Sequence, residues 1–462
     1  MTVDLVVRNG KIVTPYDIVE AGMGVDNGRI VLIAKDTNLP EADASIDAKG
    51  GFVLPGLIDA HVHFRDPGNT EREDFETGTK AAAAGGVTTI LEMPISTPAV
   101  SSAEIFERRK SIVERKAVID FGLYGGAGQD SIDEIRKMAR VGAVGFKTFL
   151  QKPQKGRENE FRGIYATDNG SMLRVLQETG KTGLISSVHA EDNSIIEHMT
   201  QSLKRAGRTD PMAHIESRPD FAETISISSL IILANAADAR LHIAHMSTKE
   251  GVRLVGQAKA SKQRVTAEAA VNHLMLTSEA MKKMGSYAKI NPPLRSREDV
   301  EELWKGLNTG TIDIITSDHA PYVQKEKDQG SDNIWNAFAG SPQIETMLPL
   351  LLTKVNEGKM TLNKLVKVTS ESVAKIFGLY PKKGTISVGS DADFVIVNMS
   401  GQKKIDRERM YTKARTIALY DGWSVKGLPV LTVVRGRIVM NSGEFTGKPG
   451  YGAFIRPLKS LS

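Results

Sequence analysis

Short apolar runs separated by turn residues occur at both ends of the chain. The runs lie at residues 5–7, 11–13, 29–33, 392–397 and 431–439. Asn9-Gly10 and Asp26-Asn27-Gly28 each precede an apolar run near the N-terminus, and such turn residues between two runs are a strong hairpin signal. We expect residues 1–53 and 381–462 to form one small β-sandwich domain. Two unrelated β caps are the alternative.

Between these ends, over residues 54–380, strand-like apolar runs alternate with helical stretches. The strand candidates lie at residues 52–58, 87–91, 119–124, 144–149, 183–188, 241–244, 265–267 and 312–316. The alternation predicts an α/β fold with a parallel sheet, and the number of strands favours a closed (β/α)8 barrel. A doubly wound open sheet is the alternative. No GxGxxG follows a first strand, so a nucleotide-binding form of that sheet is disfavoured.

The composition narrows the class of protein. Of 462 residues, 40% are hydrophobic and 25% are charged, as in a globular enzyme. The formal net charge is only +5 and no basic block occurs, so nucleic acid is not expected as a partner. The absence of cysteine excludes disulfides and thiolate ligands and fits a cytoplasmic location. We see no signal peptide and no apolar stretch long enough to span a membrane.

Histidines gather at the predicted carboxyl ends of strands. His61 and His63 are separated by one residue, so in a strand both imidazoles point to the same face and can bind one cation. His189 and His245 follow two other strands, and in a barrel these strand ends converge on one mouth. A single histidine at such a place is more often a hydrogen-bonded structural residue. Four of them at one mouth favour a metal site.

Asp318 and Lys147 are the other two candidates for this site. Asp318 follows the strand at 312–316, where a carboxylate can bind a metal and accept a proton from metal-bound water, or can cap the next helix. Lys147 lies inside the apolar strand 144–149, where burial lowers the pKa of an amine. It could become a carbamate that bridges two cations, act as a Schiff-base lysine, or reach the surface. The residues alone do not choose among these three.

Together these segments resemble the metal-dependent cyclic amidohydrolases, which include hydantoinases, dihydropyrimidinases, allantoinases and dihydroorotases. The matching segments keep the family's order through nearly the whole chain, at residues 55–63, 85–89, 144–147, 188–191, 243–247, 317–319 and 389–393. The resemblance implies a hydrolase that opens a cyclic amide with two divalent cations, usually zinc. By position, the first cation would be held by His61, His63, Lys147 and Asp318. Carboxylated Lys147, His189 and His245 would hold the second. Asp318 would also be the catalytic residue that moves a proton to the leaving nitrogen.

Within this family, different segments point to different substrates. Residues 63–68 and 291–295 resemble dihydroorotases, in which Arg65 would hold the substrate carboxylate beside Asn291. However, Ile95 stands where that group usually has Asn, and Tyr322 stands where it has His. Other segments, at 92–95, 120–126 and 142–147, resemble allantoinases and L-type hydantoinases. We therefore expect hydantoin or allantoin as the type of ring, and we place dihydroorotate second.

Further expectations concern the surroundings of the site and the assembly. Lys152 stands where dihydropyrimidinases and D-selective hydantoinases carry a Tyr that binds the oxyanion. The sequence therefore does not identify the oxyanion donor or the preferred enantiomer of the substrate. The polar segment 323–334 is either a lid or an exposed loop, and the exposed loop is slightly favoured. By resemblance, the chain is expected to form a homodimer or homotetramer. A catalytically inactive relative and a one-metal deaminase are the competing hypotheses, although all six expected ligands are present.

Overall fold

The computed structural model describes residues 2–458, and its larger part is a ring of parallel strands. Its strands are β8 (Leu57–Val62), β9 (Val87–Glu92), β10 (Asp120–Leu123), β11 (Gly125–Gly126), β12 (Gly145–Phe149), β13 (Ile185–His189), β14 (Arg240–Ile243), β15 (Val265–Ala270) and β16 (Ile314–Thr316). They form two hydrogen-bonded arcs, in the orders β10-β9-β8 and β11-β12-β13-β14-β15-β16.

The two arcs join at both ends, which closes the barrel. Only Tyr124 separates β10 from β11, so the two act as one strand that pairs with β9 through its first part and with β12 through its second. On the other side, Val62 bridges His319 in parallel, and the His63 N–H donates to the His319 carbonyl at 2.9 Å. Eight strands therefore form one ring, and the predicted (β/α)8 barrel is confirmed.

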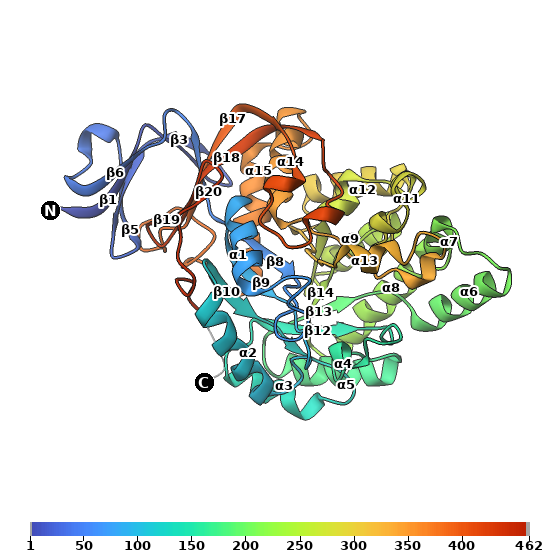
Figure 1. Cartoon of the computed structure of the whole chain (residues 1–462). Helices are drawn as coiled ribbons and strands as arrows, with labels where there is room; N and C mark the ends of the chain where they lie inside the picture. The colour runs from blue at the N-terminus through green and yellow to red at the C-terminus, as the bar shows by residue number, and fades with distance from the viewer. Residues whose placement is uncertain (1, 459–462) are drawn as a thin grey trace.

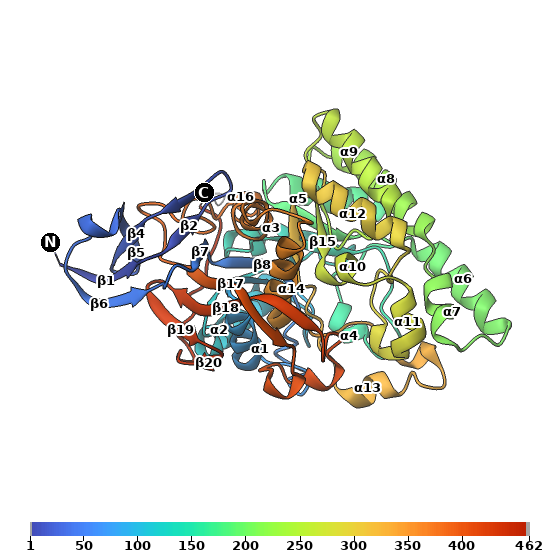
Figure 2. The ribbon, with the colours of Figure 1, turned by 90° about the horizontal axis from the view of Figure 1, so that it is seen from above.

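Helices connect the barrel strands and cover them on the outside (Figures 1 and 2). The covering helices are α1 (Phe75–Ala84), α2 (Ala103–Lys116), α3 (Ile135–Arg140), α5 (Asn169–Gly180), α8 (Asp220–Ala236), α9 (Lys249–Ala260), α12 (Arg297–Thr309) and α14 (Ile344–Asn356). Their ends carry ordinary capping residues. The Ser296 side chain accepts from the Asp299 N–H at the start of α12, and Gly310 ends that helix in a left-handed conformation with φ of 90°.

Other helices lie in the connections that follow the barrel strands. They are α4 (Glu158–Phe161), α6 (Asn193–Arg205), α7 (Pro211–Glu216), α10 (Val271–Met275), α11 (Glu279–Met284) and α13 (Gln324–Asp328). After them come α15 (Leu362–Val366) and α16 (Ser372–Ile376), which lead to the last part of the chain. Across residues 2–458, no helix combines the length and the apolar character needed to cross a bilayer.

Both ends of the chain build a smaller β domain beside the barrel (Figure 1). A four-stranded sheet holds β1 (Val3–Arg8), β4 (Gly22–Asp26), β5 (Arg29–Ala34) and β6 (Ala42–Asp47). A seven-stranded sheet holds β2 (Lys11–Val13), β3 (Ile18–Glu20), β7 (Phe52–Pro55), β17 (Phe394–Lys404), β18 (Ser424–Val434), β19 (Arg437–Asn441) and β20 (Glu444–Phe445). The central pairing is antiparallel, with Phe394 of β17 opposite Pro55 of β7.

The two sheets share one apolar core. Buried side chains of β1, β4 and β5, such as Val7, Met23 and Ile30, form a single cluster with Val53 of β7 and Phe394 of β17. Alternation along each strand turns one face inward, so the sheets pack face to face as in a sandwich. Strands from both ends of the sequence therefore contribute to one core.

A buried ionic cluster joins the β domain to the barrel. The Lys383 ammonium lies 2.5 Å from Asp120 Oδ2, 2.5 Å from Asp393 Oδ2 and 3.0 Å from Asp391 Oδ2. Asp120 begins barrel strand β10, whereas the other two carboxylates precede β17. Asp120 also accepts from Arg435 Nε at 3.2 Å. The cluster therefore links three segments that are far apart in the sequence.

Candidate active site at the barrel mouth

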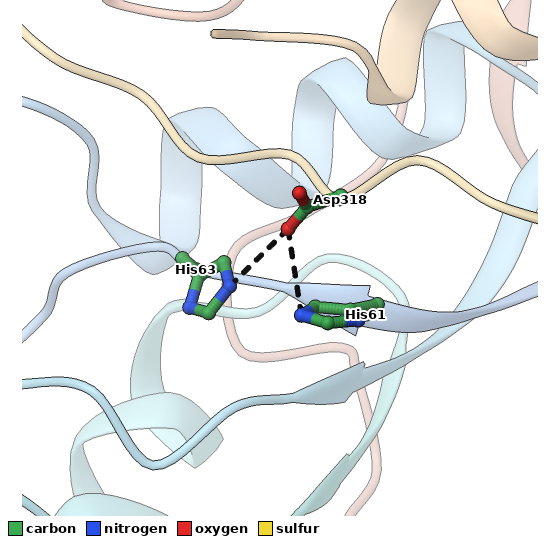
Figure 3. A group of neighbouring side chains, drawn as sticks. All are labelled: His61, His63 and Asp318. Carbon is green, nitrogen blue, oxygen red and sulfur yellow. Dashed lines mark ion pairs between the residues drawn. The ribbon is translucent and has the colours of Figure 1, made fainter. Parts of the chain in front are cut away.

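The end of β8 brings two imidazoles and one carboxylate together. His61 Nε2 and His63 Nε2 each lie 3.4 Å from Asp318 Oδ1, and both rings point toward that oxygen (Figure 3). The strand period of two places the rings on the same face, with their centroids 5.2 Å apart. Within the described part of the chain, ligand atoms of these three residues lie within 4.8 Å of one another, a spacing suited to one cation.

Two further histidines continue this group from the neighbouring strands. His189 ends β13 and His245 follows β14, and their facing nitrogens, Nδ1 and Nε2, lie 3.0 Å apart. The ring centroids of His245 and His61 are 5.1 Å apart. The structure therefore brings together the four histidines that the sequence placed at one mouth.

Lys147 lies on β12 between these groups and is fully buried. Within residues 2–458, its Nζ finds no hydrogen-bond partner. Burial lowers its pKa to about 8, although Glu268 and Asp318 oppose that effect. Burial likewise raises the pKa of Asp318 to about 8, although Lys147 opposes this rise. An unpartnered buried amine beside histidines fits a lysine that becomes a carbamate ligand, because an anion there would complete a set of nitrogen and oxygen donors suited to zinc.

Three residues around the site adopt positive φ angles, which are rare for residues other than glycine. The values are 61° for Arg65, 32° for His245 and 48° for Asp318. Such conformations cost free energy and persist only where the surroundings hold them. Part of the support comes from buried Asp59, whose Oδ1 accepts from the His61 N–H at 3.2 Å and from the Ser317 N–H at 3.1 Å. Asp59 thus ties the end of β8 to the end of β16.

Two buried carboxylates outside the predicted ligand set contact the histidines. Glu268 of β15 accepts from His61 Nδ1 and from His242 Nε2. Burial alone would raise the pKa of Glu268, but His61 and His242 lower it below the ordinary value. Glu191 contacts His189 Nε2 at 2.8 Å and also Arg218 Nη1 at 2.6 Å. In the sequence, the feature that could have identified Glu268 is its position as a charged residue inside an apolar strand.

The site opens into a cavity of about 280 Å³. Arg65, Ile95, Asn291 and Tyr322, the four predicted substrate contacts, all line it together with the four histidines and Asp318. Lys152 also lines it, but its ammonium is largely exposed and lies 3.7 Å from Glu197. The structure therefore places all the predicted site residues except Lys147, which is buried behind them, on the lining of one cavity. It leaves the oxyanion donor unassigned.

The Arg65 guanidinium is buried against the ring of Tyr322. Its Nη2 donates to Tyr322 Oη at 3.3 Å, and its carbon lies 5.1 Å from the ring centroid. Neither Nε nor Nη1 finds a partner among the residues described. Burial lowers the pKa of Arg65. A guanidinium with free donors in a cavity is suited to a carboxylate or a carbonyl oxygen of a bound molecule.

The polar segment 323–334 is only partly an exposed loop: about half of its residues are exposed, but it contains the short helix α13 and several buried side chains. Lys327 is fully buried, and its ammonium donates to the carbonyls of Lys289, Phe338 and Gly340 at 3.0, 3.0 and 2.8 Å. Glu326 pairs with Arg72 at 2.7 Å. A polar residue is normally exposed, but here backbone carbonyls replace water around the charge. The segment itself does not line the cavity, but Tyr322 and Trp335 on either side of it do.

Comparison with known proteins gives a consistent result. The model of the Amidohydrolase family matches residues 52–439. An L-hydantoinase of Paenarthrobacter aurescens is 37% identical over 454 residues, which are 98% of each chain. A dihydroorotase of Methanothermobacter thermautotrophicus is 39% identical over 433 residues, covering 94% of this chain and 93% of the relative. The solved L-hydantoinase (dihydropyrimidinase) from Arthrobacter aurescens superposes with a TM-score of 0.95 at 37% identity, covering 98% of this chain and 100% of that one. The chain therefore belongs to the amidohydrolase family.

Proposed function

We propose that this protein is a hydrolase that opens a cyclic ureide or cyclic amide of the hydantoin or allantoin type. One observation carries the proposal: four histidines and Asp318 line one small cavity at the barrel mouth, and the buried Lys147 amine interacts electrostatically with Asp318. A set of this kind is suited to activating water against a carbonyl. A relative of similar length, an L-hydantoinase, supports the choice of ring.

The residues fit two divalent cations, with zinc as the expected metal. His61, His63, Lys147 and Asp318 would hold one cation, and Lys147, His189 and His245 the other. The buried Lys147 amine would serve as a carbamate, which supplies the anion that both cations need. When bound, the cations would polarise the scissile carbonyl and make water nucleophilic at neutral pH.

Asp318 is the proposed proton carrier. Its carboxylate faces His61 and His63 at the end of the cavity, where it can accept a proton from the attacking water. It would then give this proton to the ring nitrogen as the carbon–nitrogen bond breaks. The carbon–oxygen bond formed at the same carbon yields an open-chain N-carbamoyl acid or its analogue.

The test is an assay of the zinc-loaded protein on hydantoin, allantoin, dihydrouracil and dihydroorotate. We expect turnover of at least one of the first two, and loss of that turnover in Asp318→Asn. A protein that holds two cations yet turns over none of the four compounds would refute the proposal. A protein that holds none would revive the hypothesis of an inactive relative.

Dihydroorotate is the second candidate substrate, and Arg65 favours it. Two guanidinium nitrogens of Arg65 lack partners within the described chain and lie at the cavity. Ile95, however, offers no hydrogen bond to a carboxylate. In Arg65→Gln, a dihydroorotase would lose far more activity on dihydroorotate than on hydantoin. An equal effect on both rings would remove dihydroorotate from consideration.

A homodimer or homotetramer in the cytoplasm completes the proposal. Phe221, Ile225 and Ile232 of α8 lie on one helical face and are 49%, 46% and 65% exposed, which supports burial against another copy. Light scattering after size-exclusion chromatography would give the number of subunits. A monomer at all concentrations would contradict this expectation.

A further inference from the structure

We propose that Glu268 is a positioning residue that prepares both cation subsites at once; this inference rests on the proposed function. Glu268 lies on β15 and is fully buried. Its Oε1 accepts from His61 Nδ1 and from the His245 N–H at 3.0 Å, and its Oε2 contacts His242 Nε2 at 3.1 Å. A single carboxylate thereby contacts one proposed ligand from each subsite.

In the first subsite, Glu268 sets the tautomer of His61. An ionised carboxylate can only accept hydrogen bonds, so His61 Nδ1 must carry the hydrogen. The other nitrogen, Nε2, then keeps its lone pair, and it is this nitrogen that points toward Asp318 at 3.4 Å. A cation needs that lone pair, and a carboxylate behind a metal-binding histidine generally supplies this arrangement.

In the second subsite, Glu268 acts on the backbone of His245. The His245 N–H donates to Oε1 at 3.0 Å, while the Met246 N–H donates to the Glu268 carbonyl at 2.9 Å. These two bonds fix the chain where His245 has its positive φ of 32°. The imidazole is thereby directed to within 3.0 Å of His189 Nδ1.

His242 holds the far oxygen of Glu268. Its Nδ1 lies 2.8 Å from Thr266 Oγ1, so the ring is fixed between that hydroxyl and the carboxylate. This contact stops the carboxylate from rotating away from His61. It also explains why a histidine without a predicted ligand role is buried in the barrel beside the site.

The first test is Glu268→Gln in the zinc-loaded protein, titrated with a competing chromophoric chelator. The amide has one acceptor oxygen for three N–H donors, and its NH₂ can donate to His61 Nδ1. The hydrogen of His61 would then move to Nε2 and block the lone pair. We expect cation affinity to fall roughly 10–100-fold, the usual effect of losing such a contact.

Glu223→Gln is the matched control. Glu223 is also buried, and it accepts from the Ser247 and Thr248 N–H groups at 2.8 and 3.2 Å without contacting a proposed ligand. We expect this variant to keep the affinity of the unchanged protein. Equal losses in both variants, or no loss in Glu268→Gln, would overturn the role of Glu268.

Two variants at His242 keep the test decisive if Glu268→Gln does not fold. His242→Gln can still donate to Glu268 Oε2 and should retain the cations, whereas His242→Leu should weaken their binding. Equal affinity in these two variants would also overturn the proposal. If the protein without any substitution binds no cation, both this inference and the proposed function are refuted. Two bound cations without turnover would refute only the proposed function.

Discussion

Replacing Lys383 with methionine should destabilise the junction between the two domains. Lys383 is buried, and three carboxylates surround its ammonium at 2.5, 2.5 and 3.0 Å. These carboxylates hold the pKa of Lys383 above its ordinary value despite its burial. Methionine has a similar length but carries no charge, so the variant would leave three buried acids without their shared cation.

The size of the loss follows from the contacts that remain. Removing one partner of a buried ion pair costs about 3–5 kcal/mol, because the other charge stays buried. Asp120 keeps Arg435 Nε at 3.2 Å, and Asp393 keeps the Arg435 N–H at 2.7 Å. We therefore expect the free energy of unfolding to fall by about 3–5 kcal/mol, and not by that amount for each carboxylate.

The loss of stability in Lys383→Met should become smaller as the pH is lowered. Burial already raises the pKa of Asp393, and removing Lys383 would raise it further. A group whose pKa is higher in the folded than in the unfolded state stabilises at acidic pH and loses that contribution as pH rises. The difference between variant and unchanged protein should therefore shrink on acidification. If the folded variant binds one proton more than its unfolded chain, its free energy of unfolding rises by at most about 2.7 kcal/mol between about pH 7.5 and about pH 5.5.

The measurement is urea unfolding followed by tryptophan fluorescence and circular dichroism at both pH values. Lys305→Met is the control, because Lys305 is exposed and pairs with Glu302 at 3.1 Å on the surface of α12. Losing this ion pair should lower the free energy of unfolding by less than about 1 kcal/mol. A Lys383→Met variant as stable as this control, with no gain on acidification, would refute the reasoning.

Three further predictions concern the site. Asp318→Asn should lower kcat on the preferred ring by roughly 10²–10⁴-fold, the usual contribution of a proton-transfer group, and steady-state kinetics would show a smaller loss if another group moves the proton. Lys327→Met should remove the three hydrogen bonds that its ammonium donates and destabilise the segment 334–340 by about 1.5–3 kcal/mol. Amide hydrogen exchange in this segment that is as slow as in the protein without the substitution would contradict this. Lys147→Met should abolish binding of the second cation, which elemental analysis would measure, and full occupancy would exclude a bridging role.

Much of the fold was predictable because local patterns determine it. Alternating strand and helix patterns lead to a parallel barrel, and strand ends in a barrel share one mouth. For that reason His61, His63, His189 and His245 could be assigned to one site before their distances were known.

Contacts that depend on the register between distant strands were not predictable. Glu268 meets His61 across 207 positions of sequence, and Lys383 meets Asp120 across 263. Nothing in the neighbouring residues of either one indicates its partner. Lys327 was misjudged for a related reason: its run is polar, but the carbonyls that surround it come from segments folded over it.

The seven-stranded sheet imposes an order on biosynthesis. Strands β2, β3 and β7 leave the ribosome early, but β17 to β20 are made only after the entire barrel. Until then the early strands expose unpaired edges and an apolar face, which favours aggregation. The nascent chain should therefore depend on a chaperone that shields its first fifty or so residues. Truncation of the protein from the carboxyl end should be tolerated poorly, because it removes the strands that pair with the early ones.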